Sequence, residues 1–135
     1  MIEAIKFALR YDPSPNPRVG AVLVDKNNKI KKITAHTEKD KDHAEYNLVK
    51  NSDITENDTL YVTLEPCFHD DTSPSCANAV LETNVQNIVV GDIDRDERTN
   101  GKGIELLKNN DLNVSIENGV NDFLNPGYKI KNDKP

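Results

Sequence analysis

Two short stretches decide how this chain must fold: Asp42-His43-Ala44-Glu45, and the sequence Thr-Leu-Glu-Pro-Cys-Phe-His-Asp-Asp-Thr-Ser-Pro-Ser-Cys at residues 63–76. Together they contain an imidazole two residues before a carboxylate, and the only two thiols of the chain, Cys67 and Cys76. One imidazole and two thiolates are a ligand set that suits a Zn²⁺ ion whose fourth position stays open to water. The rest of the chain must then act as a scaffold that brings the two stretches together.

The order His-x-Glu, followed later by Pro-Cys, is typical of zinc-dependent nucleobase deaminases, in which the Glu transfers protons and does not bind the metal. We therefore predict that His43, Cys67 and Cys76 are the zinc ligands and that Glu45 is the catalytic proton carrier. The predicted reaction replaces a ring amino group by a carbonyl and releases ammonia.

Each of these residues also has a purely structural explanation. A lone histidine at a helix start is common, Glu45 could form a capping box with Asp42, and two cysteines can pack as small apolar side chains. Eight residues separate the cysteines, whereas the usual deaminase form is Pro-Cys-x-x-Cys. However, Cys67 follows a predicted strand and Cys76 lies in the first turn of a predicted helix, where the helix N-terminus favours thiolate. The occurrence of the histidine, the glutamate and both cysteines together, in this order and on these predicted elements, favours a metal site over the separate structural explanations.

The hydrophobic pattern predicts short strands alternating with helices. Four helices are expected. The first covers residues 2–9, the second begins after an N-cap at Asp42, the third runs from an N-cap at Ser73 to Leu81, and the fourth covers residues 103–109. Strands are expected over residues 19–24, 30–35, 59–64, 88–91 and 112–116, with the first two forming a hairpin. This order predicts an α/β fold, a three-layer αβα sandwich with a central mixed sheet of about five strands flanked by helices.

The composition indicates one globular domain. The 135 residues are 36% hydrophobic and 30% charged, which is enough for a single core. The formal net charge is −6 and no dense Lys/Arg cluster occurs, so we expect no nucleic-acid partner. No stretch has the length of a membrane span and the N-terminus lacks a secretory pattern. We therefore expect no membrane partner, a cytoplasmic location and no disulfide between the cysteines.

Beyond the two stretches, the chain resembles the deaminase domain of the bifunctional riboflavin-biosynthesis deaminase–reductase over nearly its whole length. The resemblance is carried by a PNPxVGAV-like segment at 14–22, by His36 seven residues before His43, by the metal loop 63–76 with its long cysteine spacing, by the GxG turn Gly101-Lys102-Gly103-Ile104, and by the exit Leu124-Asn125-Pro126-Gly127-Tyr128.

This resemblance implies the three-layer cytidine-deaminase-like fold, Zn²⁺ as cofactor, and an aminopyrimidine substrate. The implied substrate is diaminohydroxyphosphoribosylaminopyrimidine, which is deaminated in riboflavin biosynthesis. Asn16, His36 and His69 would bind it. Residues 1–128 would form the deaminase domain and residues 129–135 a polar C-terminal tail, with the family's reductase domain absent. A separate reductase therefore stays open as a partner, and exposed edge strands leave association between copies of the chain open.

Several residues depart from the family pattern on the substrate side. They are Asp40 in place of a Gly, Asn47 in place of a His, Thr72 in place of a basic residue, the acidic pair Asp70 and Asp71, and Asp-Arg-Asp-Glu at 94–97 in place of a DPNP-like segment.

The loss of a cation matters because phosphate recognition favours Lys or Arg. Arg18, Lys39 and Lys41 are the candidates to replace it. Two alternatives stay open: a deaminase of another small base or nucleoside, and a zinc-stabilised binding module without turnover. The retained Glu45 argues against the second, because a structural metal site needs no proton carrier.

Overall fold

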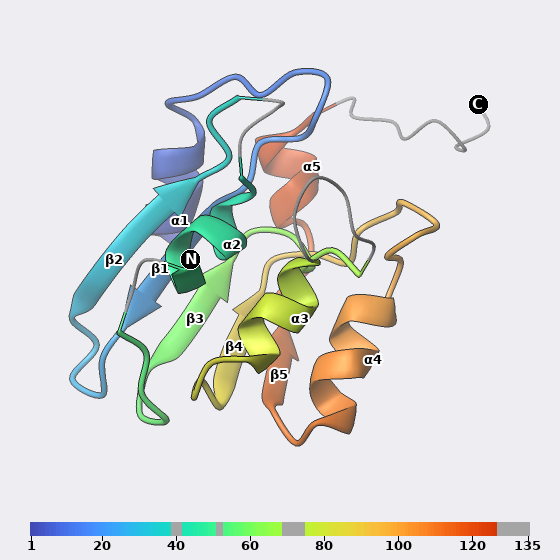
Figure 1. Cartoon of the computed structure of the whole chain (residues 1–135). Coiled ribbons are helices and arrows are strands. Elements are labelled where there is room, and N and C mark those ends of the chain that lie inside the picture. Colours follow the sequence, from blue (N-terminus) through green and yellow to red (C-terminus); the bar gives the residue numbers. More distant parts are fainter. Residues whose placement is uncertain (39–41, 51–52, 69–74, 127–135) are drawn as a thin grey trace.

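The computed structural model describes residues 1–38, 42–50, 53–68 and 75–126, and it has three layers (Figure 1). The central sheet contains five strands: β1 (Gly20–Val24), β2 (Ile30–Ala35), β3 (Thr59–Val62), β4 (Asn87–Val90) and β5 (Asn113–Ile116). The helices are α1 (Ile2–Ala8), α2 (Ala44–Lys50), α3 (Cys76–Leu81), α4 (Lys102–Asn109) and α5 (Val120–Leu124).

The sheet is mixed, with the strand order β2-β1-β3-β4-β5. Strand β1 is antiparallel to both of its neighbours, whereas β3, β4 and β5 run parallel to one another. The predicted hairpin and the predicted α/β fold with a mixed sheet are both confirmed.

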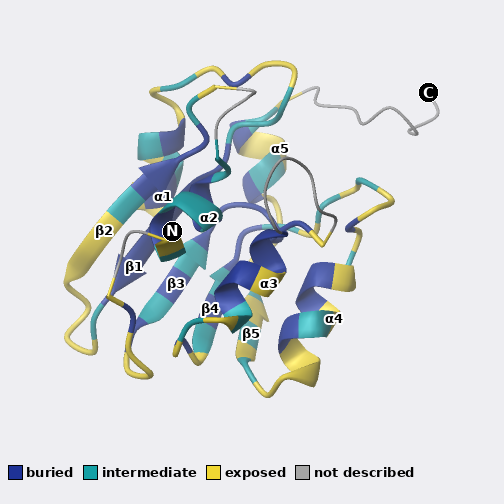
Figure 2. Cartoon of the chain, viewed as in Figure 1, coloured by how far each residue is buried: buried dark blue, intermediate teal, exposed yellow. Residues whose placement is uncertain are grey.

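Strand β1 lies at the centre of the packing because both of its faces are buried. Ala21 and Leu23 belong to the main core, which the sheet forms with α2, α3 and α4. Val22 and Val24 point the other way, as alternate residues of a strand must, and pack in a smaller cluster with Ala4 of α1. Helices α1 and α5 lie behind the sheet in Figure 1, and β1 is buried along its whole length, whereas the first half of the outer strand β2 is exposed (Figure 2).

Gly20 allows α1 to pack closely on the start of β1. A Cβ atom at this position would lie 2.1 Å from the carbonyl oxygen of Ala4, far inside van der Waals contact. The absence of a side chain at Gly20 therefore fixes how the first helix lies on the sheet.

Two predicted helix caps are wrong. Helix α3 begins at Cys76 and its N-cap is Ser75, whose Oγ accepts a hydrogen bond from the Asn78 amide; the predicted cap, Ser73, lies outside the described residues. Helix α2 begins at Ala44, two residues after the predicted cap Asp42, whose carboxylate accepts a hydrogen bond from Lys50 Nζ at 3.1 Å. The other predicted boundaries agree with the structure to within two residues.

Helix α5 was not predicted from the sequence. It has five residues, too few for a periodic pattern, and its start is held by the carboxylate of Asp92, which accepts hydrogen bonds from the amides of Gly119 and Asn121. The predicted tail, residues 129–135, lies outside the described residues. None of the helices in the described ranges is long and apolar enough to cross a membrane.

Candidate functional site

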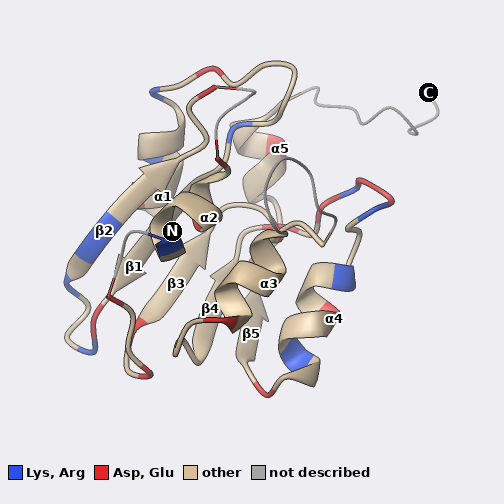
Figure 3. Cartoon of the chain, in the orientation of Figure 1, with Lys and Arg blue, Asp and Glu red and all other residues tan. Residues whose placement is uncertain are grey.

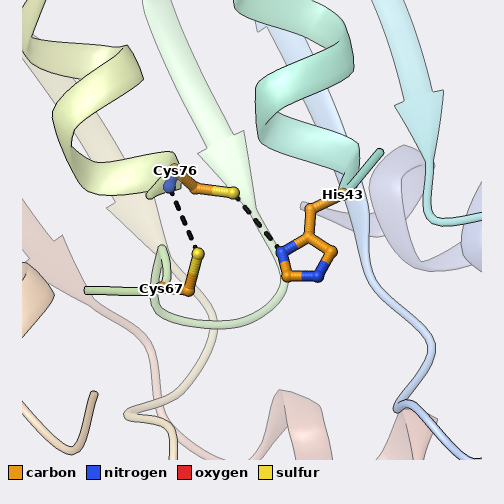
Figure 4. A group of neighbouring side chains, drawn as sticks. All are labelled: His43, Cys67 and Cys76. Atoms are coloured by element: carbon orange, nitrogen blue, oxygen red, sulfur yellow. Dashed lines mark hydrogen bonds between the residues drawn. The ribbon is translucent and has the colours of Figure 1, made fainter. Parts of the chain in front are cut away.

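The structure brings His43, Cys67 and Cys76 together at one end of the parallel strands (Figure 4). His43 directly precedes α2, Cys67 follows β3, and Cys76 is the first residue of α3. Their ligand atoms all lie within 4.8 Å of one another. Cys76 Sγ is 3.5 Å from His43 Nδ1, and the Cys76 amide donates a hydrogen bond of 3.2 Å to Cys67 Sγ.

Backbone hydrogen bonds hold the two cysteines in place. The carbonyl oxygen of Cys67 accepts a hydrogen bond of 3.0 Å from the Ala77 amide, which ties the segment after β3 to the first turn of α3. The next amide, that of Phe68, donates to Thr99 Oγ1 over 3.1 Å. Both thiols are buried, and no disulfide joins them.

The donor set fits a zinc ion. The pKa of the Cys67 thiol is lowered, chiefly by a hydrogen bond from the Cys76 side chain, and the pKa of Cys76 is raised by the same hydrogen bond and by burial. Without a metal the pair therefore shares one proton and carries one negative charge. Two thiolates and an imidazole are ligands that Zn²⁺ prefers, and metal binding would displace the shared proton.

Glu45 lines the cavity that adjoins the three residues and is only 3% exposed. Burial raises the pKa of its carboxyl group to about 7. A group that changes protonation state near neutral pH is well matched to proton transfer. The capping-box alternative loses support because α2 begins at Ala44, so Asp42 is not the N-cap that a capping box with Glu45 requires.

The cavity also contains two of the three residues that the family resemblance assigned to the substrate. Asn16 and His36 line it, and Asn16 Nδ2 lies 3.0 Å from His36 Nε2. His36 Nδ1 lies 3.2 Å from the carbonyl oxygen of Asp42, which can only accept, so Nδ1 carries the proton and Nε2 accepts from Asn16. Burial lowers the pKa of His36 and so favours this neutral form. The third residue, His69, lies outside the described residues.

Sequence reasoning missed the role of Glu65, the glutamate of the Thr-Leu-Glu-Pro-Cys motif. This carboxylate is 2% exposed and accepts three backbone hydrogen bonds, from the amides of Asp94 (3.1 Å), Gly101 (2.8 Å) and Ile104 (3.0 Å). It therefore anchors both ends of the loop between β4 and α4 and supplies the N-terminal cap that α4 lacks locally.

Gly103 makes this approach sterically feasible. A Cβ atom at Gly103 would lie 2.2 Å from the carbonyl oxygen of Pro66 and 3.3 Å from Glu65 Oε2. The GxG turn in the sequence is thus the place where α4 touches the metal loop, a contact that the motif alone did not indicate.

The basic residue that lines the cavity was also missed. Arg98, in the loop between β4 and α4, is a cavity-lining residue together with Asp94 and Asp96. The predicted candidate Arg18 does not line the cavity, and its Nε donates to the carbonyl oxygen of Tyr11 over 2.9 Å. The other two predicted candidates, Lys39 and Lys41, lie outside the described residues.

Comparisons with known proteins agree on the kind of protein to which this chain is similar. The model of the cytidine and deoxycytidylate deaminase zinc-binding region matches residues 1–92. The chain is 33% identical over 119 residues to the diaminohydroxyphosphoribosylamino-pyrimidine deaminase of Buchnera aphidicola subsp. Schizaphis graminum, covering 86% of this chain and 80% of that protein. The corresponding protein of Buchnera aphidicola subsp. Acyrthosiphon pisum is 38% identical over 105 residues, covering 77% of this chain and 71% of the relative.

Among solved structures, the chain resembles a diaminohydroxyphosphoribosylaminopyrimidine deaminase/5-amino-6-(5-phosphoribosylamino)uracil reductase of Thermotoga maritima. The TM-score is 0.82 at 31% identity, and the match covers 92% of this chain but only 37% of that one. The chain thus corresponds to about a third of this larger protein.

Proposed function

Because the chain belongs to the cytidine and deoxycytidylate deaminase zinc-binding family, we propose that it is a diaminohydroxyphosphoribosylamino-pyrimidine deaminase. Its cofactor is Zn²⁺. In the proposed reaction, water replaces the amino group on the pyrimidine ring, giving a ring carbonyl and ammonia. The observation that carries the proposal is the buried carboxyl of Glu45 in one cavity with His43 and Cys67.

The metal ligands in this proposal are His43, Cys67 and Cys76. When bound by such a ligand set, zinc lowers the pKa of water toward neutrality and so makes hydroxide available at cellular pH. The chain's own contribution is to hold the three donors close together on two helix starts and one strand end, with the thiols shielded from solvent.

Glu45 moves the protons. It accepts one proton from the attacking water and delivers it to the ring nitrogen. It then takes the second proton from the hydroxyl group that the attack places on the ring carbon and delivers it to the departing amine, which leaves as neutral ammonia while the ring carbonyl forms. Its position inside the cavity keeps bulk water away from these transfers. The raised pKa of about 7 allows the carboxyl both to accept and to release a proton near neutral pH.

Asn16 and His36 orient the substrate in this proposal. The hydrogen bond between them fixes the rotation of the Asn16 carboxamide, because only its Nδ2 can donate to the acceptor on His36. An amide held in this way presents a defined pattern of donors and acceptors to a polar heterocycle or a ribose. His69, as the resemblance implied, remains the third proposed contact.

A deaminase of another small base or nucleoside is the second candidate function. The observation in its favour is that Asp94 and Asp96 line the same cavity, since carboxylates repel a phosphorylated ligand unless they are compensated. A zinc-stabilised binding module is a weaker candidate, because nothing in such a module requires a buried carboxyl beside the cluster.

A reductase is the proposed partner, because the name of the Thermotoga maritima relative combines a deaminase with a reductase activity. We propose that the deaminated ribosylaminouracil phosphate passes to such a reductase. The proposed compartment is the cytoplasm, although a plant relative from Arabidopsis thaliana is described as chloroplastic.

Ammonia release distinguishes the candidates. The zinc-loaded protein should deaminate the pyrimidinone ribosylamino 5′-phosphate and leave cytosine, cytidine, guanine and adenosine largely unchanged. Complementation of a riboflavin auxotroph that lacks only the deaminase step is the test in cells. Ammonia release from another base together with failed complementation would replace the leading proposal by the second candidate, and no release from any of them would favour the binding module.

A further inference from the structure

We propose that Arg98 is the residue that recognises the 5′-phosphate of the substrate and so determines specificity for phosphorylated over unphosphorylated pyrimidines. This inference rests on the proposed function, because the phosphate is part of the compound that the relatives' names specify. It concerns a residue outside the zinc cluster, the proton carrier and the pair Asn16 and His36.

The position of Arg98 supports the assignment. Of the lysines and arginines in the described part of the chain, Arg98 is the one that lines the cavity beside the zinc cluster. It belongs to the loop between β4 and α4, where two basic residues flank two acidic ones (Figure 3). Its side chain is 58% exposed, whereas Glu45 at the reacting end is 3% exposed. A pyrimidine ring beside Glu45 therefore leaves the phosphate end of the molecule at the solvated end of the cavity.

The guanidinium group is held by a neighbouring carboxylate. Arg98 Nε lies 3.0 Å from Asp96 Oδ1 and Nη2 lies 2.6 Å from Asp96 Oδ2, while the Arg98 amide donates to the same carboxylate over 3.0 Å. A fork-to-fork pair of this kind fixes the plane of the guanidinium. It also neutralises Asp96, which would otherwise repel a phosphate.

The loop that carries Arg98 is anchored on both sides. Glu65 binds the amides of Asp94 and Gly101, and Thr99 Oγ1 accepts from the Phe68 amide. The residue after Arg98 is thereby tied directly to the segment that follows Cys67. Binding a ligand through a side chain on an ordered loop loses less conformational entropy than binding it through a side chain on a flexible loop. The ordered loop therefore increases the contribution of the Arg98 guanidinium to the binding free energy.

The chemistry of the ligand completes the argument. A phosphate monoester carries between one and two negative charges at neutral pH, and the chain has a formal net charge of −6. Two acidic residues, Asp94 and Asp96, line the same cavity. A phosphorylated substrate therefore needs a cation at this wall. Asp96 takes one hydrogen each of Nε and Nη2, so we expect the phosphate oxygens to bind through the other hydrogens of Nη1 and Nη2.

The test compares the substrate with the same compound after removal of its phosphate. In Arg98→Ala, the ratio of kcat/KM for the phosphorylated over the dephosphorylated compound should fall roughly 10- to 100-fold, mainly through KM, because charge-assisted hydrogen bonds are lost. Arg98→Lys should keep part of the preference, since it retains the charge but not the fork. Inorganic phosphate should inhibit the wild-type protein more strongly than Arg98→Ala.

Arg95→Ala is the matched control. Arg95 lies in the same loop, is 62% exposed, and pairs with Asp122 at 3.7 Å without lining the cavity. Its removal changes the net charge by the same amount, so the substrate ratio should change by no more than about twofold, as expected for an exposed charge.

The failure of this inference can be distinguished from the failure of the proposed function. If the wild-type protein deaminates the phosphorylated compound and Arg98→Ala leaves the ratio unchanged, or Arg95→Ala lowers it as strongly, Arg98 does not recognise the phosphate and the deaminase function stands. If the zinc-loaded wild-type protein deaminates neither compound, the proposed function itself is overturned and the assignment of Arg98 falls with it.

Discussion

Nδ2 of Asn16 donates a hydrogen bond of 3.0 Å to Nε2 of His36, which joins the segment before β1 to the residue that follows β2. The bond exists only while His36 is neutral, because a protonated imidazole donates from both nitrogens and would place two donors against each other. The state of one buried histidine therefore controls how the asparagine faces the cavity.

This relationship predicts acid sensitivity of the fold. Burial lowers the pKa of His36 from its ordinary value of 6.5. The unfolded chain consequently binds a proton at this residue at a higher pH than the folded chain does, so stability is present above about pH 6.5 and is lost as the pH falls toward the lower folded pKa. The free energy of unfolding in urea, measured in excess zinc, should decrease over this interval.

The variant His36→Gln tests the assignment, because glutamine can accept from Asn16 but does not titrate. The His36 ring packs edge-on against the ring of the proposed ligand His43, with 5.0 Å between centroids, so the zinc content of both proteins is measured across the same pH range. The pH profile of the variant should be flatter than that of the wild type between about pH 7 and about pH 5. Parallel profiles would show that His36 does not cause the acid sensitivity.

Glu45→Gln should separate metal binding from catalysis. The substitution keeps the shape of the side chain but removes proton transfer, so the variant should retain stoichiometric zinc and lose at least about 100-fold in kcat. Zinc content by metal analysis and ammonia release are the two measurements. Glu105→Gln, at an exposed position on α4, is the control and should retain activity. Substantial turnover by Glu45→Gln would exclude Glu45 as the proton carrier.

Zinc uptake by the metal-free protein should release protons. The thiols of Cys67 and Cys76 share one proton in the metal-free state, because the pKa of Cys67 is lowered and that of Cys76 is raised. Binding through two thiolates must displace that proton, so at neutral pH at least about one proton should leave per zinc ion. Titration calorimetry in buffers with different ionisation enthalpies measures this number. A heat of binding that does not depend on the buffer would contradict a site with both thiols as ligands.

The fold could be predicted well from the sequence because its main elements are fixed by local patterns. The apolar runs around Val22 and Ile88 end at turn residues, and a short turn makes the first two strands a hairpin. The choice between Ser73 and Ser75 as the cap of α3 could not be made in this way, since both are good N-cap residues. Ser75 is favoured by a tertiary contact, the hydrogen bond from the Cys76 amide to Cys67 Sγ.

The residues of the candidate site likewise fall into two groups: those that a local sequence pattern predicts and those that depend on tertiary contacts. The proximity of His43, Cys67 and Cys76, and of Glu45 to the adjoining cavity, could be predicted because their residue types and order are typical of a metal site. The contacts of Glu65 could not be predicted, because they are hydrogen bonds to amides about 30 positions further along the chain. The position of Arg98 could not be predicted either, because it depends on where the loop between β4 and α4 lies relative to the cavity. The sequence indicated that the family's basic residue was missing, but not which cation lies in the cavity.

Glu65→Gln tests whether this buried carboxylate orders the loop that carries Arg98. Both carboxylate oxygens accept backbone amides, from Asp94 and Gly101 on one side and from Ile104 on the other. A glutamine of the same shape has only one oxygen, so its amide group must face at least one backbone N–H, at a cost of about 1–3 kcal/mol in the free energy of unfolding. Urea denaturation measures that cost, with Glu105→Gln again as the control.

The same variant should also affect the cavity while its zinc cluster stays assembled. If Glu65 holds the loop, its loss frees the amides of Gly101 and Ile104, and their hydrogen exchange should become faster than in the wild type. The KM for the phosphorylated substrate should rise because Arg98 is no longer pre-ordered. Faster exchange with an unchanged KM would mean that the loop is anchored by Glu65 but that its order does not matter for binding. Unchanged exchange would show that Thr99 and the contacts of α4 suffice to hold the loop.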